Sequence, residues 1–370
     1  MATPLKERYG AEVPVELARQ LALVYADFDT QHFLQLALDG YNNLELMGRG
    51  RHLAACLQAV LPEDYPQALA IVLASTASPL PAADFAMGGF FYLPHTCFVA
   101  AYGLDHFEPS MAALNQLTRL FTAEFSIRAF IERYPQRTLE QLAQWALDDN
   151  HHVRRLVSEG TRPRLPWAGR LPGFQRDPAP VLALLELLRD DPEPYVQRSV
   201  ANNLNDIGKD HPALLMAVAR RWAEDAPERR QWIIRHALRN AIKQGHPEAL
   251  AILGFGNGSP ICLEATEVTP SAVAIGGNLL VRFALHNPTD QMQTAVVDFR
   301  IHYIKANGSR VPKVFKLKNL QLPAGERCWL QKTVSLAQMS TRQHYPGLHS
   351  VDLVINGQVV AASEFTLLSD

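Results

Sequence analysis

Two kinds of hydrophobic spacing divide the chain. Up to about residue 250, apolar residues recur at intervals of three and four, which is typical of helices that bury one face. The runs are separated by short breaks such as Leu61-Pro62-Glu63. The pattern predicts packed helices over residues 14–26, 43–60, 64–77, 87–103 and 109–133.

Beyond about residue 260, apolar and polar residues alternate, as they do in half-buried strands. Alternation is clear over residues 279–285, 295–303 and 351–355, and Asn307-Gly308 and Asn356-Gly357 are typical of tight hairpin turns. About seven short strands in about 110 residues fit an immunoglobulin-like sandwich. The Cys…Trp…Cys spacing of antibody domains is missing.

Between the two patterns lies a stretch rich in glycine, Gly254 to Pro260, which has the composition of a linker. The sequence therefore predicts two domains. Residues 1–258 are expected to form an all-α, HEAT-like helical solenoid, and residues 259–370 an all-β, immunoglobulin-like sandwich.

A basic triplet recurs at the start of successive helices. Val153-Arg154-Arg155, Val196-Gln197-Arg198 and Ile233-Ile234-Arg235 end on arginines that are 43 and 37 residues apart. These spacings are close to the period of HEAT-type helical pairs. In such a stack, Arg155, Arg198 and Arg235 would follow one groove. Three unrelated helical hairpins are the alternative.

Charge is distributed unevenly along a chain of 370 residues whose net charge is only −2. Residues 1–150 hold nine Lys and Arg against seventeen Asp and Glu, whereas residues 151–243 hold sixteen against eleven. Most of these sixteen cations are arginine, the side chain better shaped for forked contacts with phosphate. The middle third therefore favours an anionic partner, although solvated helix faces also explain single arginines.

The chain has no signal-peptide pattern at its N-terminus and no apolar run as long as a membrane span. Its four cysteines lie far apart, without the paired spacing of zinc or redox sites. We therefore expect a cytoplasmic protein that binds no membrane and no metal.

The stretch from Asp148 to Ala168 brings a basic helix, an acid and an indole together. Asn150 is a good N-cap residue, and Gly160 is expected to end the helix in a left-handed conformation. The segment Thr161 to Pro166 contains two prolines and is expected to wrap a surface. Trp167 follows it. Such a combination suits a polyanion that carries a positive group.

Two more acids stand out. Glu124 is predicted at the edge of a helical apolar stripe, where it either forms a structural ion pair, for example with Arg128, or faces a cleft. Asp206 shares a helix face with Arg198 and Asn202, so it should line the same groove as Arg198. A structural acid at the helix C-terminus is the alternative for Asp206.

Three long motifs then resemble the AlkC/AlkD superfamily of DNA alkylation-repair glycosylases. They are HVRRLVSEGTRPRLPWA from His152, VQRSVANNLNDIGKDHP from Val196 and RRQWIIRHALRNAIKQGHPEAL from Arg229. The appended sandwich points to the AlkC branch. Members are HEAT-like solenoids that excise cationic bases, 3-methyladenine and in the AlkC branch also 3-methylcytosine, without flipping the base into a pocket.

The resemblance implies a monofunctional glycosylase of base excision repair that acts on alkylated double-stranded DNA and needs no cofactor or obligate protein partner. By resemblance, Glu124, Glu159, Asp206 and Trp167 match active-site residues, and Arg155 and Arg198 match groove-lining arginines. The further cations expected to contact DNA are Arg154, Arg162, Arg164, Arg235, Arg239, Lys243, Lys313 and Lys316.

Alternatives remain open at this point. Lys313 and Lys316 could meet phosphates, but lysines also protect an edge strand from aggregation. A non-catalytic HEAT-type scaffold for an acidic protein segment would explain the arginines, and a sensor of alkylated DNA would keep the acids without releasing a base.

Overall fold

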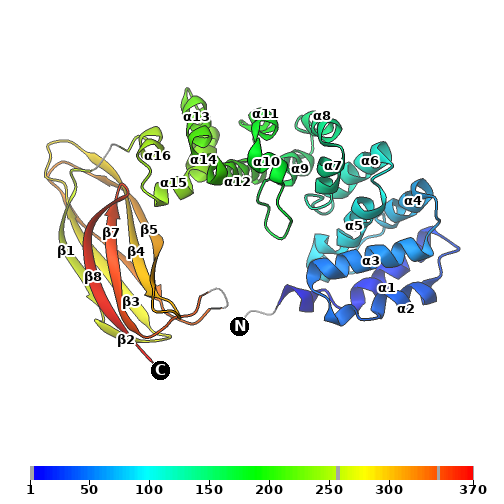
Figure 1. Cartoon of the computed structure of the whole chain (residues 1–370), viewed down its shortest axis with the longest axis horizontal. Helices are drawn as coiled ribbons and strands as arrows, with labels where there is room; N and C mark the ends of the chain where they lie inside the picture. The colour runs from blue at the N-terminus through cyan, green and yellow to red at the C-terminus, as the bar shows by residue number, and fades with distance from the viewer. Residues whose placement is uncertain (1–3, 256–258, 340–341, 370) are drawn as a thin grey trace. The chain divides into compact units, whose positions relative to one another are not determined.

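The computed structural model describes residues 4–255, 259–339 and 342–369 (Figure 1). It confirms a HEAT-like helical array followed by an immunoglobulin-like sandwich. The chain forms two compact units, one of residues up to Pro212 with Pro227–Ile233, the other of Ala213–Ala226 with the residues from Ile234 on. The predicted linker lies partly outside the described residues, at 256–258, so the domain boundary at 258 stays a prediction.

The first unit consists of helices joined by short connections. Its helices are α1 (Glu12–Val24), α2 (Thr30–Leu38), α3 (Leu46–Val60), α4 (Tyr65–Ser75), α5 (Leu93–Tyr102), α6 (Phe107–Thr118), α7 (Ile127–Arg133), α8 (Pro135–Trp145), α9 (His151–Gly160), α10 (Pro172–Arg176), α11 (Ala179–Leu188) and α12 (Pro194–Asp210). Of three 3-10 helices, η1 (Leu5–Arg8) precedes α1, η2 (Tyr41–Asn43) lies between α2 and α3, and η3 (Phe85–Tyr92) lies between α4 and α5. Helix α9 packs on α12. Helix α9 carries the first part of the motif that begins at His152, and α12 carries most of the motif that begins at Val196.

The helix predicted over 109–133 is interrupted. Helix α6 ends at Thr118 and α7 begins at Ile127, so Glu124 lies in the connection rather than in a helix. The Thr122 hydroxyl oxygen accepts a hydrogen bond from the backbone N–H of Glu124 at 3.4 Å. Such a local side-chain bond competes with the helical ladder, which explains the break without Gly or Pro.

Two expectations for the stretch around α9 need correction. Asn150 does cap the helix, with Oδ1 accepting from the N–H of His152 at 2.9 Å. Gly160 ends the helix but is not left-handed; a Cβ there would lie 2.5 Å from Ile127 Cγ2, so glycine is needed for close packing. The loop that follows, Thr161 to Pro166, does not lie on the surface as expected, because Thr161, Arg162 and Leu165 are buried.

The second unit joins the last helices to the sandwich. The helices are α13 (Pro212–Ala223), α14 (Glu228–Ala237, whose first residues belong to the first unit), α15 (Arg239–Lys243) and α16 (Pro247–Ile252). The strands are β1 (Cys262–Thr269), β2 (Ala272–Ala274), β3 (Asn278–His286), β4 (Gln293–Ile304), β5 (Arg310–Leu322), β6 (Arg327–Ser335), β7 (Gly347–Ile355) and β8 (Gln358–Leu368). All three predicted alternating runs fall inside strands.

The sandwich has a three-stranded sheet, β1-β3-β6, and a five-stranded sheet, β2-β8-β7-β4-β5. Its core is built from inward residues of both sheets, such as Leu279 and Phe283 of β3 against Phe299 of β4 and Leu353 of β7. Asn307-Gly308 connects β4 to β5 and Asn356-Gly357 connects β7 to β8, as predicted.

Two glycine backbones touch within the second unit. A Cβ on Gly245, in the turn between α15 and α16, would lie 2.7 Å from the Cα of Gly357 in the β7–β8 turn. Both glycines have positive φ, at 73° and 79°. Within the described residues, none of the helices has the length and apolar character that crossing a bilayer requires.

Candidate active site

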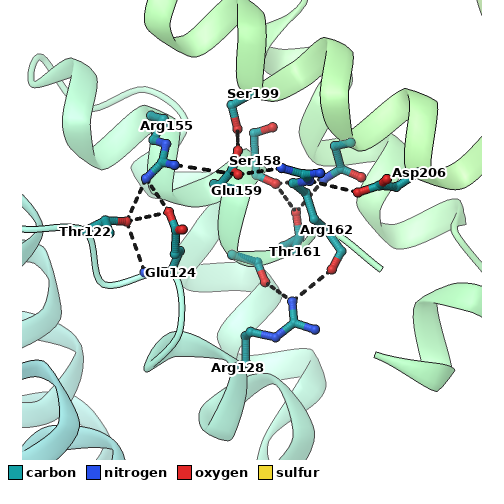
Figure 2. A network of polar contacts seen from close by, with 12 residues as sticks. Thr122, Glu124, Arg128, Arg155, Ser158, Glu159, Thr161, Arg162, Ser199 and Asp206 are labelled. Carbon is teal, nitrogen blue, oxygen red and sulfur yellow. Dashed lines mark hydrogen bonds and ion pairs between the residues drawn. The ribbon is translucent and has the colours of Figure 1, made fainter. Parts of the chain in front are cut away.

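Acids and cations alternate in one chain of ion pairs that links α9, α12 and two connecting segments (Figure 2). We call this chain the acid ladder; its members are Glu124, Arg155, Glu159, Arg162, Asp206 and Lys209. Arg155 pairs with Glu124 Oε2, and its Nη2 lies 3.6 Å from Glu159 Oε1.

The ladder continues beyond Glu159. Arg162 donates from Nη1 to Glu159 Oε1 at 2.6 Å and from Nε to Asp206 Oδ2 at 2.8 Å. Lys209 then donates to Asp206 Oδ1 at 2.8 Å. The three acids are buried, and removing one partner of a buried pair typically costs about 3–5 kcal/mol. The three acids are therefore retained in the interior only because each has a cation beside it.

Glu124 is the ladder acid that keeps an oxygen to spare. Arg155 and the Thr122 hydroxyl both donate to Oε2, the latter at 2.7 Å, and Oε1 has no hydrogen bond or ion pair among the described residues. Burial raises the pKa of Glu124 above its usual value, and Glu159 adds to this, while Arg155 and Thr122 lower it. The sequence-based alternative of a pair with Arg128 is wrong, since the partner is Arg155.

Glu159 and Asp206 are held from more sides. Ser199 donates to Glu159 Oε2 at 2.6 Å, so both oxygens of Glu159 have partners. Asp206 is only 1 % exposed, behind Arg162. The expectation that Asp206 would line the same groove as Arg198 is not met, because Asp206 is buried against Arg162 whereas Arg198 is exposed.

A pocket of about 560 Å³ opens beside the ladder. Glu124, Arg155 and Glu159 contribute to its polar lining, whereas Asp206 does not reach it. Aromatic side chains make much of the remaining wall; they are Phe90, Phe121, Phe125, Trp167 and Tyr195. The guanidinium of Arg155 lies 4.9 Å from the centroid of the Tyr195 ring, a cation–π contact that fixes this arginine.

Trp167 projects from the loop after α9. Its φ is 65°, a left-handed backbone that a large side chain adopts at a cost on the order of 1–3 kcal/mol. The indole is 63 % exposed although it lines the pocket. A strained backbone that holds an exposed aromatic ring at a pocket indicates a binding surface.

Comparisons with known proteins agree with this geometry. Residues 113–243 match a family model described as DNA alkylation repair enzyme, and residues 262–369 match the C-terminal Ig-like domain of uncharacterised protein YhaZ. The chain is 38 % identical over 362 residues to Uncharacterized protein YhaZ of Bacillus subtilis (strain 168), covering 98 % of each. It is 40 % identical to Pseudomonas fluorescens alkylpurine DNA glycosylase AlkC, solved bound to DNA containing an abasic site analog, with a TM-score of 0.93 over 99 % of this chain and 100 % of that one.

The chain belongs to the AlkC family of DNA alkylation-repair glycosylases. In this AlkC-family structure, the arginines near the pocket are mostly paired within the protein. Arg154 makes two bonds to Asp191, at 2.6 and 3.1 Å, and Arg164 makes two to Asp210, at 3.0 and 2.5 Å. Arg198, by contrast, is exposed and has no ion pair among the described residues. Arg155 and Arg198 therefore differ in their surroundings and do not follow one groove as equivalent, exposed arginines.

The second unit of the AlkC-family chain carries the other expected DNA contacts. Arg235 and Lys243 are exposed, and Arg239 donates to the carbonyl of His236 at 2.6 Å. Lys313 and Lys316 are exposed on β5, which is the edge of the five-stranded sheet. Lys316 donates to Asn319 Oδ1 at 2.6 Å. Both readings of these lysines, phosphate contact and edge protection, stay open.

Several site residues of this AlkC-family chain escaped sequence reasoning. Thr122, Ser199 and Tyr195 meet the acids or Arg155 from other segments, and nothing in their local sequence indicates this. The segment of η3 could have been noticed in the sequence, since Phe-Ala-Met-Gly-Gly-Phe-Phe-Tyr is strongly aromatic. In the structure, Ala86 and Met87 adopt positive φ there. The described residues contain no group of three or more His, Cys, Asp or Glu disposed to hold a metal ion.

Proposed function

We propose that this chain is a DNA glycosylase that hydrolyses the N-glycosidic bond of cationic N3-alkylated bases, 3-methyladenine and 3-methylcytosine, in duplex DNA. It does so without flipping the base into a pocket and leaves an abasic site. The observation that supports this most strongly is the pair of buried carboxylates, Glu124 and Glu159, that line one pocket together with Arg155 and the exposed Trp167. Its similarity to Pseudomonas fluorescens alkylpurine DNA glycosylase AlkC supports the same reaction class.

The chemistry needs fixed negative charge more than acid catalysis. As the bond between C1′ and the base nitrogen breaks, its electron pair goes to the base, which is already a cation and leaves as a neutral molecule. Positive charge then grows on the sugar, and water adds to C1′ and loses a proton. A carboxylate held in place beforehand stabilises that charge at no further cost of reorganisation.

The two acids suit different tasks. Glu124 Oε1 has no hydrogen bond or ion pair within the described residues, so we assign it to hold the water and take its proton. Glu159, with both oxygens occupied, supplies fixed charge beside the sugar. An acid–cation contact at 4 Å in a partly solvated site is worth about 4 kcal/mol. Asp206 acts on Glu159 through Arg162 and is a positioning residue.

Trp167 offers its exposed face to the lesion. A cationic base over an indole gains about 0.5–2 kcal/mol. The residues that line the pocket include no lysine, and Lys209 of the acid ladder is bound to Asp206. A Schiff base with the opened sugar has no amine there, so the product is an intact strand with an abasic site.

The test is release of free base. A duplex with one 3-methyladenine or 3-methylcytosine is incubated with the protein, and free base is measured by chromatography. Glu124→Gln and Glu159→Gln should lose base release while they keep duplex affinity. Glu140→Gln, an exposed acid of α8 away from this pocket, is the matched control and should behave like the unchanged protein.

Other outcomes point elsewhere. Selective binding of alkylated duplex without base release would indicate a sensor, and no preference for damaged DNA would indicate a scaffold. Strand cleavage by β-elimination without added base would contradict the monofunctional reaction.

A further inference from the structure

Arg128, on α7, is a buried arginine that the proposed chemistry does not use. It is 6 % exposed, and among the described residues it has no carboxylate within ion-pair distance. Its guanidinium donates to three backbone carbonyls instead (Figure 2 shows two of them): Gly160 at 3.1 Å, Arg162 at 2.8 Å and Gly169 at 2.5 Å. A buried arginine whose hydrogen bonds all go to backbone carbonyls holds a chain segment in place, because the guanidinium group can donate to several acceptors at once.

The three carbonyls bracket the segment that carries Trp167. Gly160 and Arg162 precede the indole, and Gly169 follows it. The exposed ring has little packing of its own, and the left-handed backbone at Trp167 persists only if the surroundings enforce it. Inside the loop the further backbone bonds are long, from the Ala168 N–H to Leu165 O at 3.3 Å and from the Leu171 N–H to Pro163 O at 3.2 Å.

Helix α7 also holds the segment of Glu124, the acid that lines the same pocket as the indole. The N–H of Ile127 bonds to the carbonyl of Ala123 at 3.0 Å, so the connection that holds Glu124 runs directly into α7. The side chain of Ile127 packs against Gly160 so closely that a Cβ there would meet it at 2.5 Å. One short helix thus holds both the Glu124 connection and the Trp167 loop.

We propose that Arg128 is a positioning residue that sets the place of the Trp167 indole in the pocket that Glu124 also lines. Its effect on base release rests on the proposed glycosylase function. Its effect on the indole does not, so the two parts can fail separately.

The position of the indole can be followed without any substrate. Labelling with 5-fluorotryptophan gives one fluorine resonance for each of the five tryptophans, and the one missing from Trp167→Phe belongs to Trp167. In Arg128→Met that resonance should move toward the position of a solvated, mobile indole, while the other four stay. Arg128→Lys, which keeps donors but not the fork, should move it part of the way.

The chain offers a matched control in Arg49. This arginine is 5 % exposed and donates to four backbone carbonyls, those of Leu44, Lys6, Tyr9 and Asn42. Arg49→Met removes the same kind of group and should leave the Trp167 resonance in place. An unmoved Trp167 resonance in both Arg128 variants, or an equal movement in Arg49→Met, overturns the proposal. If Arg128→Met does not fold, Arg128→Lys decides.

Kinetics test the link to chemistry. Misplacing the indole can cost no more than losing it, so single-turnover base release by Arg128→Met at saturating protein should fall by up to the about 2- to 30-fold expected for loss of the indole contact. The effect should largely vanish when Trp167 is already alanine, because Arg128 then has no indole to place. An equal loss in both backgrounds overturns the proposal. A lack of base release by the unchanged protein would instead refute the proposed function and leave the fluorine test standing.

Discussion

Replacing Glu159 by glutamine removes one negative charge from the acid ladder and keeps its shape. Oε2 of the present carboxylate accepts from Ser199 at 2.6 Å, and an amide oxygen can take over that bond. The bond from Arg162 to Oε1 at 2.6 Å is lost. Neither arginine is stranded, because Arg162 keeps Asp206 and Arg155 keeps Glu124.

The magnitudes separate folding from catalysis. One hydrogen bond to a charged group contributes about 1.5–3 kcal/mol, so the free energy of unfolding should fall by that amount and the protein should stay folded. A carboxylate facing a sugar cation at 4 Å contributes about 4 kcal/mol to the transition state. Base release should therefore fall by about a thousandfold, since each 1.36 kcal/mol is a factor of ten.

The assay is single-turnover release of 3-methyladenine from a duplex, with urea unfolding measured on the same samples. Ser199→Ala is the matched control, because it removes a neutral donor from Glu159 and leaves the charge. Loss of this bond to a charged group should lower the free energy of unfolding by about 1.5–3 kcal/mol, while base release should change far less than in Glu159→Gln because the charge stays. If Glu159→Gln stays within tenfold of the unchanged protein while folded and bound to duplex, the electrostatic reasoning is refuted.

Three further outcomes follow from the same geometry. Because burial raises the pKa of Glu124 above 4.5, base release should fall on acidification with a midpoint above that value, and Glu124→Gln should lack this limb of the pH profile. Since the folded pKa exceeds the unfolded one, the contribution of Glu124 to stability should also decline as pH rises through the folded value. Arg198→Ala should lower the slope of log affinity against log salt by about 0.9 for one phosphate contact, whereas Arg154→Ala, which breaks a pair with Asp191, should lower the unfolding free energy and leave the slope unchanged. Trp167→Ala should slow base release by about 2- to 30-fold and hardly change the urea midpoint, because the indole is exposed; a rate within error of the unchanged protein would remove the indole from the mechanism.

Features set by local chemistry were predictable from the sequence. The Asn150 cap depends on a side chain two residues from its donor, and the turn at Asn356-Gly357 needs only two residues that accept positive φ. The alternating runs of the sandwich follow from burial of one strand face. In each case the deciding interaction lies within a few positions along the chain.

The environment of the acids could not be predicted in this way. Arg155 and Arg198 occupy the same place in their triplets, yet only Arg155 has carboxylates on either side. One of these, Glu124, comes from a connection 31 residues earlier in the chain. The sequence predicts that this connection is helical because the apolar spacing of the flanking helices continues through it. The hydrogen bond of Thr122 that interrupts the helix cannot be recognised from the hydrophobic pattern.

The contact between Gly245 and Gly357 has a consequence for mechanics. The backbones of the two turns are in direct contact there, and no side chain lies between them that could change its conformation to absorb a displacement. The turn after α15 and the β7–β8 hairpin must therefore shift in concert when either is displaced. A side chain added at either glycine would push the two turns apart, so this contact between the last helices and the sandwich requires glycine on both sides.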